Sequence, residues 1–268
     1  MPADAIGSRV VSRPCRMPKT TRWRSPRKIA ATAIAAATIL AGVGCAYAQD
    51  VHESRDGEPI IGGPCEGCEA VFQGLPAGLT ANARIAPEEE PGEPMRVEGT
   101  VYDQSGRPAA GVIVYAYHTD AHGIYPPDEA MRGRAAYRHG RLRGWVQTDA
   151  QGRYRFDTVR PGGYPNSRTP THVHMHVIEV DRCTYYISSI HFEDDPRLTP
   201  EQRDELTAGR GGRGLVRPTR DDDGVWVVTR DIRLGAGVPG YPSNEGRECP
   251  SAPDSGGRRH PLDNDRFR

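Results

Sequence analysis

The sequence predicts an all-β protein, an antiparallel β-sandwich with long loops and irregular termini. Between residues 95 and 235, short segments rich in β-branched and aromatic residues alternate with segments rich in Gly, Pro, Asp and Asn. The segments rich in Gly, Pro, Asp and Asn allow the backbone to turn, as in DAQG at 149–152 and RPGGYP at 160–165. Several short strands at such spacing, with little helical pattern, are typical of two packed antiparallel sheets.

The predicted strands follow one another along the sandwich segment. They cover residues 96–103, 111–120, 144–149, 153–159, 172–180, 184–192 and 225–234. One short helix is expected within TPEQRDELTAG, at 199–209.

Three further segments flank the predicted sandwich, which we delimit at residues 95–235. Residues 1–48 are typical of a secretory signal peptide, with a basic stretch, an apolar run and a small-x-small motif ending at Ala48. Residues 49–94 are rich in Gly, Pro and Glu and contain a CxxC motif, and APEEEPGEP at 86–94 predicts a solvated linker. Residues 236–268 predict an irregular tail.

The leader predicts export to the periplasm or the medium. Its apolar run is too short for a comfortable membrane span, so the mature chain is expected to have no stable one. An uncleaved anchor, a lipoprotein site at Cys45 and a start at Met17 rather than Met1 are the alternatives. Cleavage would remove eight of the 35 basic and one of the 35 acidic residues. The mature chain would keep 27 basic and 34 acidic residues, which gives a net charge of −7. This acidic balance argues against a nucleic-acid partner.

Four cysteines would remain after cleavage: Cys65, Cys68, Cys183 and Cys249. An even number in an exported chain suggests disulfides, and four cysteines allow three pairings. We expect Cys65 with Cys68 and Cys183 with Cys249. A CxxC pair is also half of a zinc site, but the sequence offers no second CxxC or nearby CxxH to complete it.

Candidate site residues gather around one predicted strand. THVHMHV, at 171–177, puts His172, His174 and His176 on one face, because side chains alternate along a strand. Tyr125 comes just after another strand, and Tyr164 lies in a Gly-Pro turn. Taken singly, each has a structural explanation, as a packed tyrosine or a surface histidine. Three more histidines are flanking candidates only: His118, His122 and His191.

In this order and context, the two tyrosines and the HxH motif resemble the iron ligands of the intradiol ring-cleavage dioxygenases, the family of protocatechuate 3,4-dioxygenase and catechol 1,2-dioxygenase. The resemblance runs from about residue 97 to 203 and includes DAQGRYRFDTVRPGGYP and YYISSIHFEDDPRLTPEQR. It implies Fe(3+) as cofactor, with His176 outside the ligand set. Phenolate oxygens are hard anionic donors that favour Fe(III), and imidazoles suit iron generally. The implied metal ligands are Tyr125, Tyr164, His172 and His174.

The resemblance also implies an activity. The enzyme would use O2 to cleave a catechol-type ring between its two hydroxyl carbons, giving a muconate-type diacid. Tyr164 is expected to be displaced by the catechol and to accept one of its protons, which is general-base catalysis. Arg168 is expected to stabilise negative charge developing near the ring.

Departures from the family pattern leave substrate and assembly open. The family has an arginine three residues before the first ligand histidine, where this chain has Thr169, and a glutamine where this chain has Ser189. Which catechol is cleaved, and whether the chain forms a homo-oligomer, are therefore not carried over from the family.

Two noncatalytic functions compete with this interpretation. The stretches at 97–117 and 148–164 also resemble transthyretin-like and carboxypeptidase-regulatory modules, which are structural or binding domains. The other alternative is a periplasmic metal-binding protein that uses the histidines without oxygenase chemistry. Substitution of Tyr164 by phenylalanine separates these from an enzyme.

Overall fold

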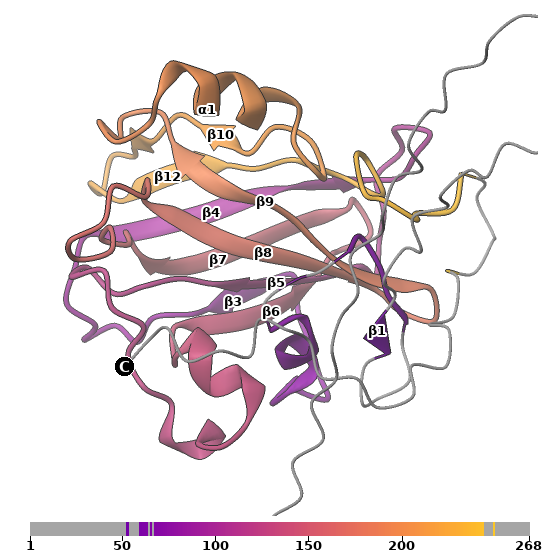
Figure 1. Ribbon diagram of the computed structural model, residues 1–268, viewed down its shortest axis with the longest axis horizontal. Helices are drawn as coiled ribbons and strands as arrows, with labels where there is room; N and C mark the ends of the chain where they lie inside the picture. The colour runs from indigo at the N-terminus through magenta and orange to yellow at the C-terminus, as the bar shows by residue number, and fades with distance from the viewer. Residues whose placement is uncertain (1–51, 54–58, 64, 66, 244–248, 250–268) are drawn as a thin grey trace, which may run out of the picture. The chain divides into compact units, whose positions relative to one another are not determined.

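The protein consists of two β-sheets with short helical segments on the connections (Figure 1). The computed structural model describes residues 52–53, 59–63, 65, 67–243 and 249, all of which lie in the compact unit formed by residues 47–268. The expected signal peptide and most of the expected tail lie outside these residues. In the described part of the chain, no helix is long and apolar enough to cross a membrane.

The first sheet has the order β1-β2-β9-β8-β5-β6, with β10 also paired to β9. Its strands are β1 (His52–Glu53), β2 (Pro59–Ile60), β5 (Ile113–Tyr117), β6 (Arg143–Gln147), β8 (His172–Glu179), β9 (Cys183–Phe192) and β10 (Leu215–Val216). The second sheet has the order β11-β12-β4-β7-β3, with β13 also paired to β4. Its strands are β3 (Asn82–Arg84), β4 (Pro94–Tyr102), β7 (Arg153–Val159), β11 (Thr219–Arg220), β12 (Trp226–Thr229) and β13 (Ile232–Arg233).

The helical segments are short. They are α1 (Pro200–Glu205), η1 (Cys68–Phe72), η2 (Glu129–Met131), η3 (Ala135–His139) and η4 (Leu206–Ala208). The helix expected at 199–209 is present as α1 and η4. Thr199 caps α1 reciprocally with Gln202, because each side chain bonds the backbone N–H of the other residue.

The predicted all-β sandwich is confirmed, with antiparallel pairing at its centre. β4 pairs antiparallel with β7, and β8 lies antiparallel between β5 and β9. Shorter strands on either side of the β4–β7 pair are parallel to it, as β3 is to β7 and β12 to β4. The strand predicted at 225–234 is interrupted at Arg230, whose buried guanidinium donates to the carbonyls of Gly211 and Asp231.

Residues before 95 contribute to the interior. Ile61 and Ile85 belong to the main core cluster, and Val71 of η1 packs in a second cluster on the outer side of the first sheet. The prediction of a solvated linker at 86–94 is wrong at Glu90, which is only 9% exposed. Arg141 binds both carboxylate oxygens of Glu90, at 2.5 and 3.0 Å, and this bidentate pairing offsets the cost of burial.

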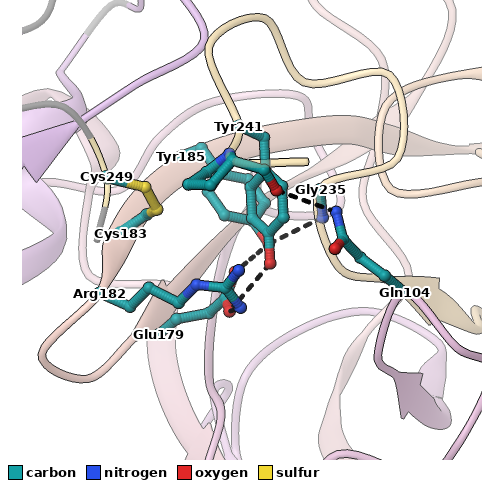
Figure 2. Close-up of a disulfide and its surroundings, with 9 residues drawn as sticks. Gln104, Glu179, Arg182, Cys183, Tyr185, Gly235, Tyr241 and Cys249 are labelled. Carbon is teal, nitrogen blue, oxygen red and sulfur yellow. Dashed lines mark hydrogen bonds and ion pairs between the residues drawn. A yellow bond between two sulfur atoms is a disulfide. The ribbon is translucent and has the colours of Figure 1, made fainter. Parts of the chain in front are cut away.

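Figure 2 shows the Cys183–Cys249 disulfide beside a buried polar cluster. The hydroxyls of Tyr185 and Tyr241 donate to the two carboxylate oxygens of Glu179, at 2.7 and 3.1 Å. The disulfide and these bonds attach the segment after β13 to the β8–β9 hairpin. The second disulfide joins the two cysteines of the CxxC motif, so both expected pairings are present.

Loss of the Cys183–Cys249 disulfide is expected to cost up to about 4 kcal/mol of unfolding free energy, because it joins residues 66 apart in the sequence. Urea denaturation of the double variant Cys183→Ser/Cys249→Ser measures this. The matched variant Cys65→Ser/Cys68→Ser breaks a bond across a separation of 3, for which the same entropy argument gives about 2 kcal/mol. Equal losses in the two variants would contradict the loop-length argument.

Candidate metal centre

Four side chains converge on one point at the start of β8, and they are the four predicted ligands. The hydroxyls of Tyr125 and Tyr164 lie 2.7 Å apart, and the Tyr164 hydroxyl lies 3.2 Å from Nε2 of His172. Nε2 of His172 lies 3.0 Å from Nε2 of His174, which lies 2.9 Å from the Tyr125 hydroxyl. Two oxygens and two nitrogens therefore form a closed ring of short contacts.

Strand alternation places the two histidines. In β8, Val173 and Met175 are each 1% exposed and belong to the core between the sheets. His172 and His174 point to the opposite face, where β5 and β9 flank them. The second hydrophobic cluster, which includes Tyr115, Tyr117 and Trp145 with parts of η1, packs on this face. The centre thus lies on the outer face of the first sheet.

Two loops bring the tyrosines to the histidines. Tyr125 follows β5 and Tyr164 follows β7, and the loops are joined where Gly162 N–H donates to the backbone carbonyl of Asp120 at 2.8 Å. The approach is so close that a Cβ at Gly123 would overlap the backbone of the Tyr164 loop. Glycine at this position therefore lets the two phenols meet.

The hydrogen bonds fix the protonation of the first histidine. Nδ1 of His172 lies 2.8 Å from the carbonyl oxygen of Pro170, and a carbonyl only accepts. Nδ1 therefore carries the proton, and Nε2 presents a lone pair to the centre. Burial lowers the pKa of His172, and burial together with the nearby His172 lowers the pKa of His174 well below its ordinary value. Both imidazoles are neutral near pH 7, which is the form that binds metals.

The donor set fits the ferric ion that the resemblance implies. Donor atoms that lie about 2.1 Å from one ion at right angles are about 3.0 Å apart. The four contacts here range from 2.7 to 3.2 Å. Two phenol oxygens, once deprotonated, match a hard trivalent ion, and two imidazoles complete a mixed oxygen and nitrogen set.

Aromatic rings support the ligand candidates. Tyr117 stacks on His174 with centroids 4.4 Å apart, and it also stacks on His139 at 3.8 Å. Nδ1 of His139 is 2.8 Å from the hydroxyl of Tyr115. His191, a flanking candidate in the sequence, lies on β9 with its ring 5.4 Å from that of His172. Tyr117 and His139 escaped sequence analysis because only the cross-strand register and η3 bring them here.

The other candidate histidines lie outside the ring of four. His176 is 3% exposed, so it does not face solvent, and its Nε2 lies 3.4 Å from Sγ of Cys65. His118 is fully buried, with its two nitrogens 2.7 Å from the carbonyl of Thr119 and 2.7 Å from the hydroxyl of Thr158, so its role is structural. His122 is exposed.

Two arginines come close to the centre in the sequence or in space. Arg168 is exposed in the loop between Tyr164 and His172. The guanidinium of Arg197 lies against Gly163, where an added Cβ would overlap it. A hollow of about 320 Å³ is lined by Arg197 and by the residues that precede Tyr164 and His172. Sequence analysis missed Arg197, because its position after β9 carries no local signal of proximity to Tyr164.

Comparison with known proteins places the chain in a family. A family model described as "Dioxygenase" matches residues 75–208, half of the chain. The chain is 30% identical over 155 residues to catechol 1,2-dioxygenase 1 of Acinetobacter lwoffii, covering 49% of this chain and 48% of that protein. It is 31% identical over 125 residues to the protocatechuate 3,4-dioxygenase beta chain of Burkholderia cepacia, covering 45% and 53%.

Among solved structures, the dioxygenase domain of a carbohydrate-binding fusion protein from Streptomyces sp. SirexAA-E aligns with a TM-score of 0.44 and 21% identity, covering 62% of this chain and 96% of that one. The chain spans about half the length of the curated relatives it matches. The matched segment 75–208 contains both tyrosines and both histidines of the centre. The chain belongs to the intradiol ring-cleaving dioxygenase family.

Proposed function

We propose that this protein is a non-haem Fe(III)-dependent dioxygenase that uses O2 to cleave a catechol-type ring between its two hydroxyl carbons, giving a muconate-type diacid. The observation that carries the proposal is the convergence of two phenol oxygens and two imidazole nitrogens, with successive contacts between 2.7 and 3.2 Å. A ferric ion at the centre of this group would bind all four atoms at once.

Tyr125, Tyr164, His172 and His174 would hold the ion. When bound, Fe(III) would act as a Lewis acid that takes both catechol oxygens and withdraws electron density from the ring. Tyr125 packs against the cluster around Tyr117, whereas Tyr164 lines the small hollow beside His172. Tyr164 is therefore the better candidate to move aside and accept a catechol proton at Oη.

The two histidines would keep their positions during this exchange. The Nδ1–H of His172 donates to the carbonyl of Pro170, which fixes the orientation of the ring. His174 is held from its side by the stacked ring of Tyr117. Desolvation lowers the pKa of both imidazoles, which keeps them neutral near pH 7.

Arg168→Ala is expected to lower kcat about 10-fold or more, if its guanidinium stabilises negative charge on the reacting ring. Arg197→Ala belongs in the same assay, because the guanidinium of Arg197 lies against Gly163 beside Tyr164. Arg153→Ala, at an exposed position of the second sheet, is the matched control and should leave kcat unchanged. A loss in Arg197→Ala with wild-type kcat in Arg168→Ala would move the role to Arg197.

The proposal is tested by the visible absorption spectrum of the purified protein with its iron quantified, before and after anaerobic addition of catechol or protocatechuate. We expect a red-brown tyrosinate-to-iron band that shifts with one of the two compounds and so identifies the substrate class. A protein that stays colourless after reconstitution with iron would contradict the proposal and favour a binding module.

We also propose that the protein is exported to the periplasm or medium and that residues 1–48 are removed. The composition of the leader supports this, and so do the two disulfides, which persist in oxidising compartments. Mass spectrometry of the protein recovered outside the cytoplasm should find Gln49 as the first residue. An N-terminus that retains the leader would contradict the proposal.

A further inference from the structure

A second group of metal-binding atoms lies one histidine further along β8. Sγ of Cys65, Sγ of Cys68 and Nε2 of His176 all lie within 4.8 Å of one another. Cys68 and His176 are each only 3% exposed, and η1 begins at Cys68. The two sulfurs form a disulfide, with the Cα atoms 5.5 Å apart. None of these atoms belongs to the ring of four around Tyr164.

Hydrogen bonding accounts for only one nitrogen of the His176 imidazole, through a contact with sulfur. Its buried Nδ1 has no hydrogen-bond partner among the residues that the structure describes. Its Nε2 points at Sγ of Cys65, 3.4 Å away. Buried His118 is different, since both of its nitrogens have oxygen partners. A buried imidazole directed at a cysteine pair is the arrangement of a zinc ligand set.

The spacing of one sulfur and the imidazole already agrees with such a set, and the two sulfurs would move apart when their bond is reduced. With Zn–S near 2.3 Å and Zn–N near 2.0–2.1 Å, a tetrahedral ion separates its sulfur and nitrogen ligands by about 3.5 Å. The distance from Cys65 Sγ to His176 Nε2 is 3.4 Å. The CxxC motif alone is half a site, and His176 supplies a third ligand 111 residues after Cys65, too distant for a sequence motif to indicate.

We propose that reduction of the Cys65–Cys68 disulfide opens a site for a thiophilic cation such as Zn2+, bound by the two thiolates and Nε2 of His176, with water as fourth ligand. A dithiol reductant supplies two electrons and two protons, the S–S bond becomes two thiols, and the reductant becomes a disulfide. Metal binding then releases the two thiol protons to solvent. A disulfide oxidant takes up the two electrons and is reduced to a dithiol, the S–S bond re-forms, and the cation is released.

The cysteine loop also touches the supports of the other centre. Gly67, between the cysteines, has φ 73°, and a Cβ there would stand 2.6 Å from Nε2 of His139. His139 stacks on Tyr117, which stacks on His174. The two sites are therefore neighbours that share no ligand, and the cation site does not depend on the proposed dioxygenase activity.

The test is an anaerobic titration of the full chain with Cd2+, with and without prior reduction by dithiothreitol. We expect reduced protein to bind one Cd2+ with an ultraviolet thiolate charge-transfer band and oxidised protein to show none. Cys65→Ser/Cys68→Ser should abolish the band, and His176→Ala should weaken binding at least 10-fold. Cys183→Ser/Cys249→Ser and Tyr164→Phe should keep it, which separates this site from the second disulfide and from the iron centre.

A readout on the wild type guards against variants that fail to fold. Zn2+ should protect Cys65 and Cys68 of the reduced protein from alkylation, with mass spectrometry locating the protected thiols. His122→Ala, at an exposed histidine, is the matched control for His176→Ala and should bind Cd2+ as the wild type does. A band that survives in Cys65→Ser/Cys68→Ser, unchanged affinity in His176→Ala, or alkylation unaffected by Zn2+ would each overturn the proposal.

Discussion

Tyr164→Phe is expected to remove ring cleavage and, because Tyr125 keeps the second phenolate, to weaken and shift the visible absorption of the iron-loaded protein. The substitution deletes only the phenolic oxygen, which lies 2.7 Å from the Tyr125 hydroxyl and 3.2 Å from Nε2 of His172. That oxygen is both a proposed ligand and the proposed base for a catechol proton. Loss of general-base catalysis alone is worth about 100-fold or more in kcat. The ring itself stays, so the fold should be unaffected.

Tyr102→Phe is the matched control for this experiment. Tyr102 ends β4 in the other sheet and lies outside the ring of four contacts. The metal-free forms of the two variants should have equal melting temperatures, while iron content, the visible spectrum and O2 uptake with catechol should change only in Tyr164→Phe. Turnover at the wild-type rate with an unchanged visible spectrum in Tyr164→Phe would exclude the ligand assignment. A changed spectrum with retained turnover would keep Tyr164 as a ligand and exclude it as the base.

The parts of the site that sequence analysis predicted are those that obey local periodicity. In β8, the alternation of His172, Val173, His174 and Met175 assigns opposite faces to histidines and apolar residues, and the burial of Val173 and Met175 agrees. Turn residues before Tyr164 predicted an irregular loop there. Because these rules act over a few residues, they hold without knowledge of the rest of the chain.

The parts that could not be predicted depend on contacts between distant segments. Arg197 reaches Gly163 only after the chain has passed through β8 and β9. His176 meets Cys65 across 111 residues, and Glu90 is buried because Arg141 lies opposite. A prediction from local sequence can only assign each residue the burial that is usual for its type. Glutamate is usually exposed, so the burial of Glu90 could not be predicted.

Histidines are the clearest case, because their burial decides how they titrate. His118 is fully buried, and burial lowers its pKa to about 4. His139 is 3% exposed, and burial, with the nearby His176, lowers its pKa to about 3. In the unfolded chain both return to about 6.5. Between pH 6.5 and about 4, the unfolded state therefore binds more protons than the native state.

The unfolding free energy of the metal-free protein is accordingly expected to fall as the pH is lowered from 6.5. Each of the two histidines lowers the unfolding free energy by about 1.4 kcal/mol for every pH unit below 6.5. At pH 5, His118 and His139 should therefore each have lowered it by about 2 kcal/mol. Asp and Glu in the unfolded chain stay mostly ionised down to about pH 5, so a lowered carboxyl pKa in the native protein adds little to the slope in this window. A combined loss of about 4 kcal/mol is a large part of the 5–15 kcal/mol typical of a folded domain.

Urea denaturation of metal-free protein at pH 7, 6 and 5 measures how steeply the unfolding free energy changes with pH. One substitution assigns part of this slope to His118. His118→Gln removes a group that is neutral when folded and protonated when unfolded, so its slope should be lower than that of the wild type by up to about 1.4 kcal/mol per pH unit. His122→Gln, at an exposed histidine of the following loop, should keep the wild-type slope. Because the slope is compared rather than the stability itself, a constant loss from packing in His118→Gln does not affect the result. Parallel plots of unfolding free energy against pH for wild type and His118→Gln would contradict this prediction, because His118 would then take up its proton in the folded protein. The hydrogen bonds of His118 with Thr119 and Thr158 would in that case have to open in acid without unfolding of the sandwich.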